Sequence, residues 1–110
     1  SPNDRVEYAN VYFRELNDEE KSIEILTNMK NNFLKMEDMI KIKGFSNNLI
    51  SRNIWNTWQK AYPDIVSSLV YIYNATNQKL EAEGVLVDWI SRFPNDNNAK
   101  QMLEDLRIKN

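Results

Sequence analysis

Residues 63–96 read PDIVSSLVYIYNATNQKLEAEGVLVDWISRFPND, and this stretch decides the expected fold. Its apolar residues recur three and four positions apart on both sides of a polar turn at Asn77, which is the spacing of two amphipathic helices. Pro63 suits the first turn of a helix, whereas inside a helix it would remove a hydrogen bond. We therefore predict one helix over 63–76 and another over 78–93. A preceding helix that continues through Pro63 is the alternative.

The N-terminal third of the chain predicts a similar pair of helices, over residues 3–35. Apolar side chains recur there at helical spacing: Val6, Ala9, Phe13, Leu16, Ile23, Leu26 and Phe33. Asp18 stands between the two runs, where its carboxylate can accept hydrogen bonds from the free N–H groups that begin the second helix. Residues 36–42 either extend that helix or form a separate short turn.

A third helix is predicted between these two pairs, and a last one at the C-terminus. Gly44 is expected to end the preceding helix as a left-handed cap, and Ser46 to begin a helix that runs to Tyr62. Asp96 is expected to cap the last helix, over 97–109. The apolar face of this last helix is the clearest amphipathic pattern in the chain: Ala99, Met102, Leu103 and Leu106. The sequence thus predicts an all-α fold of about six helices.

The composition indicates one small globular domain and excludes several kinds of chemistry. Hydrophobic residues make up 42% of the 110 residues and charged residues 27%, the ordinary balance of a globular protein. Cysteine and histidine are absent, so thiolate chemistry, the usual general base near neutral pH and the commonest transition-metal ligand are missing. We therefore expect a protein that is not an enzyme, with no catalytic residue, no cofactor and no metal.

The charge pattern narrows the class of partner. The net charge is −2 and basic residues are interspersed with acidic ones, whereas nucleic-acid-binding proteins cluster Lys and Arg. We expect no nucleic-acid partner. No apolar run approaches the roughly 20 residues of a membrane-spanning helix, so we expect no direct membrane insertion by this segment. The first residues, SPND, are typical of a piece of a larger protein.

Residues 63–96 resemble a tetratricopeptide repeat, a helix–turn–helix unit of about 34 residues. With Pro94 at the family's near-terminal proline, Leu69, Tyr73 and Ala82 occupy three signature positions. A small side chain at Ala82 lets two helices approach closely where they cross. The resemblance implies a solenoid of stacked antiparallel helical hairpins.

The rest of the chain follows the same template less closely. Residues 3–36 match as a weaker repeat, residues 37–62 form an irregular helical insert without the signature, and residues 97–109 form the capping helix that such arrays require. The better repeat itself departs from the pattern at three positions, which predicts locally altered packing: Val66, Val70 and Trp89. All of these parts are expected to belong to a single domain over 1–110.

In tetratricopeptide proteins the first helices of successive repeats line a groove that binds a protein or peptide. Carried over by position, the lining residues here are Asp64, Ser67, Tyr71 and Asn74 in the better repeat, and Glu7, Val11 and Arg14 in the weaker one. The subset that binds chaperone C-terminal carboxylates uses cations at such positions; Glu7 would repel a carboxylate there. The resemblance implies a non-catalytic interaction or scaffolding module, whose partner lies in another protein or in the rest of its own parent chain.

Trp55, Trp58 and Tyr62 also recur at helical spacing, and two interpretations stay open. Aromatic side chains at this spacing are typical of a core. A shared exposed face would instead make them an anchor for a partner helix.

A second resemblance concerns the order of a hairpin, an irregular helical middle and the tail LEAE (80–83) to FPND (93–96). This order is similar to the C-terminal region of large bacterial glycosyltransferase-like proteins with many transmembrane helices. The heavy use of Asn, Ile and Lys suits an AT-rich bacterial genome. The resemblance implies a structural or regulatory soluble appendage of such an enzyme, on the extracytoplasmic side.

Overall fold

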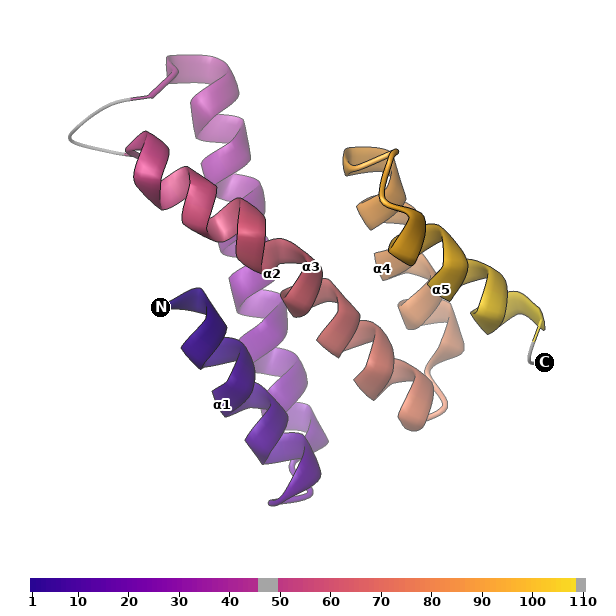
Figure 1. The fold of residues 1–110 in the computed structure, drawn as a ribbon. Helices are drawn as coiled ribbons and strands as arrows, with labels where there is room; N and C mark the ends of the chain where they lie inside the picture. Colours follow the sequence, from indigo (N-terminus) through magenta and orange to yellow (C-terminus); the bar gives the residue numbers. More distant parts are fainter. Residues whose placement is uncertain (46–49, 109–110) are drawn as a thin grey trace. The chain divides into compact units, whose positions relative to one another are not determined.

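Five helices make up the regular structure of a computed structural model, which describes residues 1–45 and 50–108 (Figure 1). Their bounds are α1 (Pro2–Arg14), α2 (Glu19–Lys43), α3 (Arg52–Ala75), α4 (Lys79–Arg92) and α5 (Asn97–Ile108). No strand occurs in the described residues, so the expected all-α class is confirmed. Five helices stand where about six were predicted, and the difference arises at Pro63.

Pro63 lies inside α3 and does not begin a new helix. The prediction of a separate helix over 63–76 is therefore wrong, and the alternative, a helix that continues through the proline, is confirmed. A proline in a helix interior costs about 3 kcal/mol, because a hydrogen bond is lost and the ring meets the preceding turn. Burial of large apolar side chains, at about 1.5–3 kcal/mol each, offsets this cost. Four buried residues surround the proline: Ala61, Tyr62, Ile65 and Val66.

Short polar side chains set the ends of several helices as the sequence predicts. Asp18 Oδ1 accepts a hydrogen bond of 3.0 Å from a first-turn N–H of α2, and Asp96 Oδ1 accepts one of 3.1 Å in the first turn of α5. Asn17 and Asn77 turn the chain with φ angles of 52° and 60°. Asparagine visits this left-handed region more readily than most residues, so both helical connections are encoded locally.

The segment between α2 and α3 agrees with the prediction in part. Residues 36–42 extend α2, which ends at Lys43. Gly44 follows and ends the helix as predicted, with a positive φ of 71°, but its ψ of −172° lies outside the left-handed helical region that was expected. The first described cap of α3 is Ser51, whose Oγ accepts a backbone N–H hydrogen bond of 3.2 Å. The predicted cap Ser46 lies outside the described residues.

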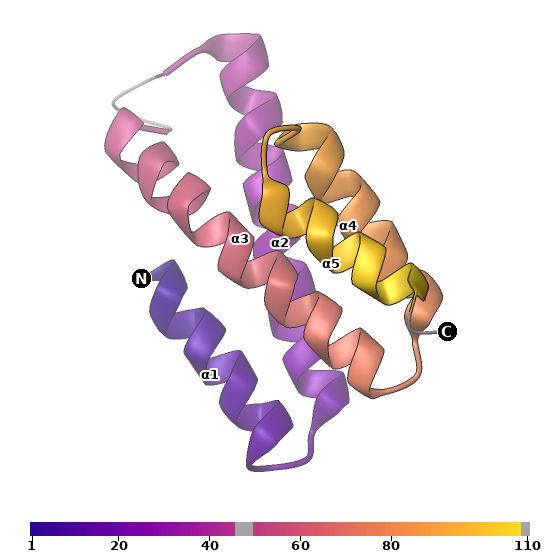
Figure 2. The ribbon, with the colours of Figure 1, turned by 45° about the vertical axis from the view of Figure 1, so that its right-hand side comes forward.

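The chain divides into two compact units, Ser1–Ile65 and Val66–Asn110, and α3 runs from the first into the second. In the first unit α1 and α2 lie side by side and antiparallel (Figure 2). Phe33 of α2 is fully buried and stacks on Trp55 of α3, with ring centroids 5.0 Å apart. The Tyr62 ring lies 4.4 Å from the same phenylalanine. Helix α2 therefore packs against both other helices of its unit.

The second unit contains the C-terminal part of α3 together with α4 and α5, and the last two helices are antiparallel neighbours (Figures 1 and 2). Arg107 of α5 donates two hydrogen bonds, of 2.8 and 3.1 Å, to Glu83 Oε1 of α4. The buried apolar residues come from all three segments: Leu69, Ile72, Ala82, Leu86, Trp89, Ala99 and Leu106. Leu69 and Ala82 thus lie in the core, Tyr73 is half-buried and Leu80 is exposed.

The leucines at 69 and 80 allow a matched test of this core. Leu69 has no exposed surface, whereas 82% of Leu80 is exposed. Leu69→Ala is expected to lower the free energy of unfolding by about 2–5 kcal/mol, because it leaves a cavity. Leu80→Ala removes the same atoms at an exposed position, so it is expected to change the free energy of unfolding by less than about 0.5 kcal/mol. Urea denaturation followed by circular dichroism measures both, and equal losses would contradict the core described above.

The two glycines are expected to respond oppositely to alanine. Gly84 lies inside α4, and a Cβ built on it has no atom within 4 Å. Gly84→Ala should therefore raise the free energy of unfolding by about 0.5–1 kcal/mol, since glycine in a helix loses more backbone entropy than alanine. Gly44→Ala should lower it by about 1–3 kcal/mol, because φ 71° with ψ −172° is a region that only glycine adopts freely. Thermal and urea denaturation of both variants would reveal a wrong sign.

Candidate functional site

The groove residues predicted on α1 lie on its surface but do not form a binding site by themselves. Glu7 and Arg14 are exposed, and Arg14 Nη2 donates a hydrogen bond of 3.0 Å to Glu7 Oε1. Val11, between them on the same face, is half-buried. The two charged side chains therefore satisfy each other, and an exposed pair of this kind contributes little to stability.

The groove residues predicted on α3 are also mostly accessible. Asp64, Tyr71 and Asn74 are exposed and Ser67 is half-buried. Asp64 belongs to the first unit and the other three to the second. A groove lined jointly by these residues and by those of α1 stays a prediction.

The three aromatic residues on α3 do not share an exposed face. Tyr62 is fully buried, so the proposed anchor is wrong for this residue and the core interpretation is confirmed. Trp55 is half-buried and stacks on Phe33 with an angle of 12° between the ring planes. Trp58 is half-buried as well and lines a shallow pocket of about 300 Å³ beside Pro2 of α1. Their helical spacing arises from packing against two neighbouring helices.

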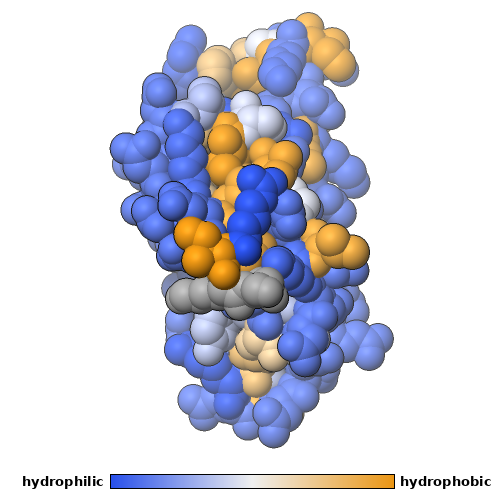
Figure 3. Space-filling model, turned by 90° about the vertical axis from the view of Figure 1, so that its right-hand side faces the viewer, coloured by the Kyte–Doolittle hydropathy of each residue, from blue (hydrophilic) through white to orange (hydrophobic). Residues whose placement is uncertain are grey.

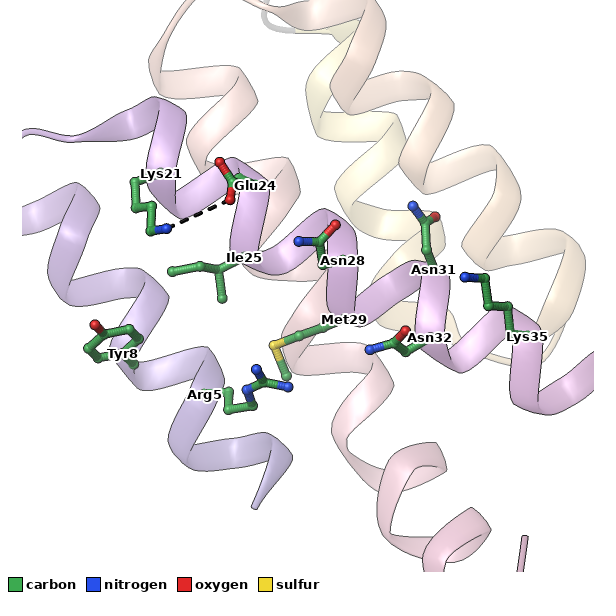
Figure 4. A pocket seen from close by; sticks show the side chains of 10 residues that line it. All are labelled: Arg5, Tyr8, Lys21, Glu24, Ile25, Asn28, Met29, Asn31, Asn32 and Lys35. Carbon is green, nitrogen blue, oxygen red and sulfur yellow. Dashed lines mark ion pairs between the residues drawn. The ribbon is translucent and has the colours of Figure 1, made fainter. Parts of the chain in front are cut away.

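A groove with a volume of about 580 Å³ lies between α1 and α2 in the first unit. We call it the α1–α2 groove, and Figure 4 shows its side chains. Two of its ten lining residues come from α1 and eight from α2: Arg5, Tyr8, Lys21, Glu24, Ile25, Asn28, Met29, Asn31, Asn32 and Lys35. None of them was among the predicted site residues.

Helical periodicity brings the α2 residues of this groove together. Positions 21, 25, 28, 32 and 35 are separated by three or four residues, and position 24 lies three after 21 and four before 28, so all six lie along one stripe of the helix. Met29, which is 1% exposed, and the half-buried Ile25 form an apolar floor. The polar side chains surround this floor and are mostly exposed. The groove is therefore a shallow polar channel with an apolar base.

Cations dominate the charge of the α1–α2 groove. Lys21 Nζ lies 3.7 Å from Glu24 Oε1, so these two charges form an ion pair at one end. Arg5 and Lys35 form no ion pair with any residue in the described parts of the chain. Figure 4 shows Arg5 beside Met29 and Lys35 toward the other end of the stripe. Two positive charges are therefore available to a ligand.

A tyrosine pair lies at the α1 side of the groove. The rings of Tyr8 and Tyr12 meet edge to face, with centroids 5.1 Å apart, and their hydroxyl oxygens are 3.1 Å apart. This hydrogen bond, and repulsion from the charge that Tyr8 would carry when ionised, raise the pKa of Tyr12 above its ordinary value. Tyr12 therefore stays neutral at physiological pH, and its ring and hydroxyl contact those of Tyr8.

The amide side chains of Asn28, Asn31 and Asn32 are the most unusual feature of the groove. All three are exposed, and none makes a hydrogen bond to another side chain or to the backbone within residues 1–45 and 50–108. Asparagine is a poor helix former, because its side chain competes for backbone hydrogen bonds. Three of them within five residues of a helix interior could have pointed to this surface from the sequence alone.

The arrangement favours non-covalent binding. Within the described residues, His, Cys, Asp and Glu side chains do not gather in threes at metal-binding distances. None of the described helices combines the length and the apolar character that crossing a membrane requires. What the groove offers is two cations, three amides and a tyrosine hydroxyl around an apolar floor.

Replacing the three asparagines tests whether they serve the fold. Asn28→Ala, Asn31→Ala and Asn32→Ala combined should raise the free energy of unfolding by about 1–2 kcal/mol, because alanine is the better helix former at each position. Asn56→Ala, on an exposed face of α3, is the single-site control and should raise it by about 0.5 kcal/mol. Chemical denaturation measures both. A loss of stability in the triple variant would mean that the amides hold the fold together.

Comparison with known proteins adds no relative to this description. No protein-family model matches the chain, and no curated protein and no solved structure is significantly similar to it. The α1–α2 groove and its side chains therefore carry the functional argument.

Proposed function

We propose that the chain is a non-catalytic protein-interaction module whose α1–α2 groove binds an extended segment of a partner protein. The observation that carries this proposal is that the exposed amides of Asn28, Asn31 and Asn32 line the groove and make no hydrogen bond to other described residues. Each primary amide both donates and accepts hydrogen bonds. It therefore matches the N–H and C=O groups of a peptide backbone in any sequence.

Buried side chains support both walls of the groove, which favours binding. Its α2 wall rests on Phe33, and its α1 wall on the fully buried Ala9. A site already formed in the free protein avoids part of the ordering cost of association. Side chains on helices are also better fixed than side chains on loops.

The proposal also includes a stacked arrangement of helical hairpins and a partner segment in another protein or in a longer parent chain. The tetratricopeptide resemblance supports a scaffolding role, and the burial of Leu69 and Ala82 is compatible with it. The bound segment lies in another protein or elsewhere in a longer parent chain. If the parent is a bacterial glycosyltransferase-like membrane protein, the module is an appendage that contacts its own enzyme.

Exposed apolar residues outside the groove offer a competing surface. On the second unit these include Leu80, Val87 and Ile108. Figure 3 shows hydrophobic side chains on the face where the chain ends, interrupted by hydrophilic ones. Single exposed apolar residues are common on monomeric proteins, so we place the proposed binding in the groove.

A peptide selection tests the proposal. The chain is immobilised and used to enrich a phage library of random twelve-residue peptides, and the enriched peptides are titrated by fluorescence anisotropy. We expect binding to fall at least about tenfold in the Asn28→Ala, Asn31→Ala, Asn32→Ala variant, which corresponds to the loss of about one or two hydrogen bonds. The Asn56→Ala control should bind as the unmodified chain does. Failure to enrich any peptide, or equal binding by the triple variant, would contradict the proposal.

A further inference from the structure

We infer that the segment held by the α1–α2 groove is acidic, and that its carboxylates pair with Arg5 and Lys35 while its backbone bonds to the asparagine amides. This inference rests on the proposed function and specifies the partner of the same site. The juxtaposition of two unpaired cations with three unpartnered amides on one helical hairpin carries it.

The charge of the groove is opposite to that of the chain. Three cations and one carboxylate line it, Arg5, Lys21 and Lys35 against Glu24, so its net charge is +2. The whole chain has 14 basic and 16 acidic residues, a net charge of −2. A local excess of positive charge on an acidic protein attracts an anionic ligand and disfavours a basic one.

The charges are unevenly distributed along the groove, and this predicts where the acids lie. Lys21 is neutralised by Glu24 at one end. Arg5 lies near the middle and Lys35 lies toward the other end (Figure 4). The acidic residues of the ligand are therefore expected in the part of the segment that passes Arg5 and Lys35. The remainder lies over a neutral pair and needs no charge.

The length of the stripe fits a short extended segment. Lys21 and Lys35 are 14 positions apart on α2, which at about 1.5 Å per residue is about 21 Å. An extended chain advances about 3.3–3.6 Å per residue, so about six residues span the groove. Side chains two positions apart point to the same side of an extended segment. Two carboxylates in that relation can face the cations together.

Other ligand classes fit the lining less well. A partner helix would need an apolar stripe to bury, and the floor offers only Ile25 and Met29. A nucleic acid would need a longer run of cations and stacking platforms, whereas the groove has two free cations and one tyrosine, Tyr8. The amides can bond to the free peptide groups of an extended segment, whereas a helix has already paired most of its own peptide groups. This surface is also distinct from the face of Glu7 and Arg14, where the two charges pair with each other.

The composition of selected peptides tests the inference. Twelve-residue random peptides are enriched on the unmodified chain and, in parallel, on an Arg5→Gln, Lys35→Gln variant and on a Lys60→Gln, Lys100→Gln control. The control removes two exposed charges outside the groove. Deep sequencing should show Asp and Glu enriched over the input library on the unmodified chain and on the control. The enrichment should disappear on the groove variant.

Affinity measurements on the best peptide complete the test. Changing its acids to Asn or Gln should weaken binding about tenfold, as expected for two exposed charge pairs. Raising the salt concentration should weaken it further, because exposed charges are screened beyond about 10 Å at 0.1 M. The reversed variant Arg5→Glu, Lys35→Glu should prefer basic peptides. Because Arg5 and Lys35 are exposed, circular dichroism should show that the variants keep their helices.

The outcomes separate this inference from the proposed function. Neutral or basic peptides that bind strongly and still depend on the three asparagines would overturn the acidic ligand and leave the interaction module standing. A mixed-sequence single-stranded oligonucleotide that displaces the peptide at lower concentration than the peptide itself would overturn the choice of a protein ligand. Absence of any asparagine-dependent peptide would overturn both.

Discussion

The contact of Phe33 with Trp55 and Tyr62 is the interaction on which the first unit depends. It joins α2 to α3 through two aromatic contacts, each of which contributes about 0.5–1.5 kcal/mol beyond the burial of surface. It also fixes the rotation of α2 about its own axis. With 3.6 residues per turn, positions 31 and 35 are turned roughly 160° away from Phe33. Once the phenylalanine is inside, those two side chains must face solvent.

In the proposed function, the same helix serves packing with one face and binding with another. Its buried face carries Leu26, Met29 and Phe33, which are apolar residues of the core. Its outer face carries asparagines, which weaken a helix and improve no packing inside the described residues. The proposed binding role would account for a polar, helix-disfavouring stripe on the longest helix of the described residues.

Features of the fold that are set by residues close together in the sequence could be predicted. Asp18 and Asp96 cap helices through hydrogen bonds to N–H groups three residues away, and Asn77 turns the chain by its own φ angle. Continuity through Pro63 could not be predicted with the same rules. The local preference for a break there is outweighed by burial of side chains such as Ile65, which depends on distant parts of the chain.

The candidate site was missed for a related reason. The groove residues were predicted from the positions that line the groove in a tetratricopeptide repeat, and on α1 these positions are occupied by residues such as Glu7 and Arg14. The structure places Arg5 and Tyr8, on another face of the same helix, beside the stripe of α2. Which face of α1 packs beside that stripe depends on contacts between residues that are far apart in the sequence. Only the density of asparagine near position 30 was visible beforehand.

The continuity of α3 has a consequence for how the protein can be dissected. Helix α3 belongs partly to each of the two compact units, because the boundary between them, at Ile65 and Val66, falls within this helix. Cleavage of the chain at this boundary would leave two short segments of α3. Neither segment would exceed the roughly 15 residues that an isolated helix needs to persist in water. Neither fragment would contain an intact α3, so each compact unit would lose part of the helix that completes it.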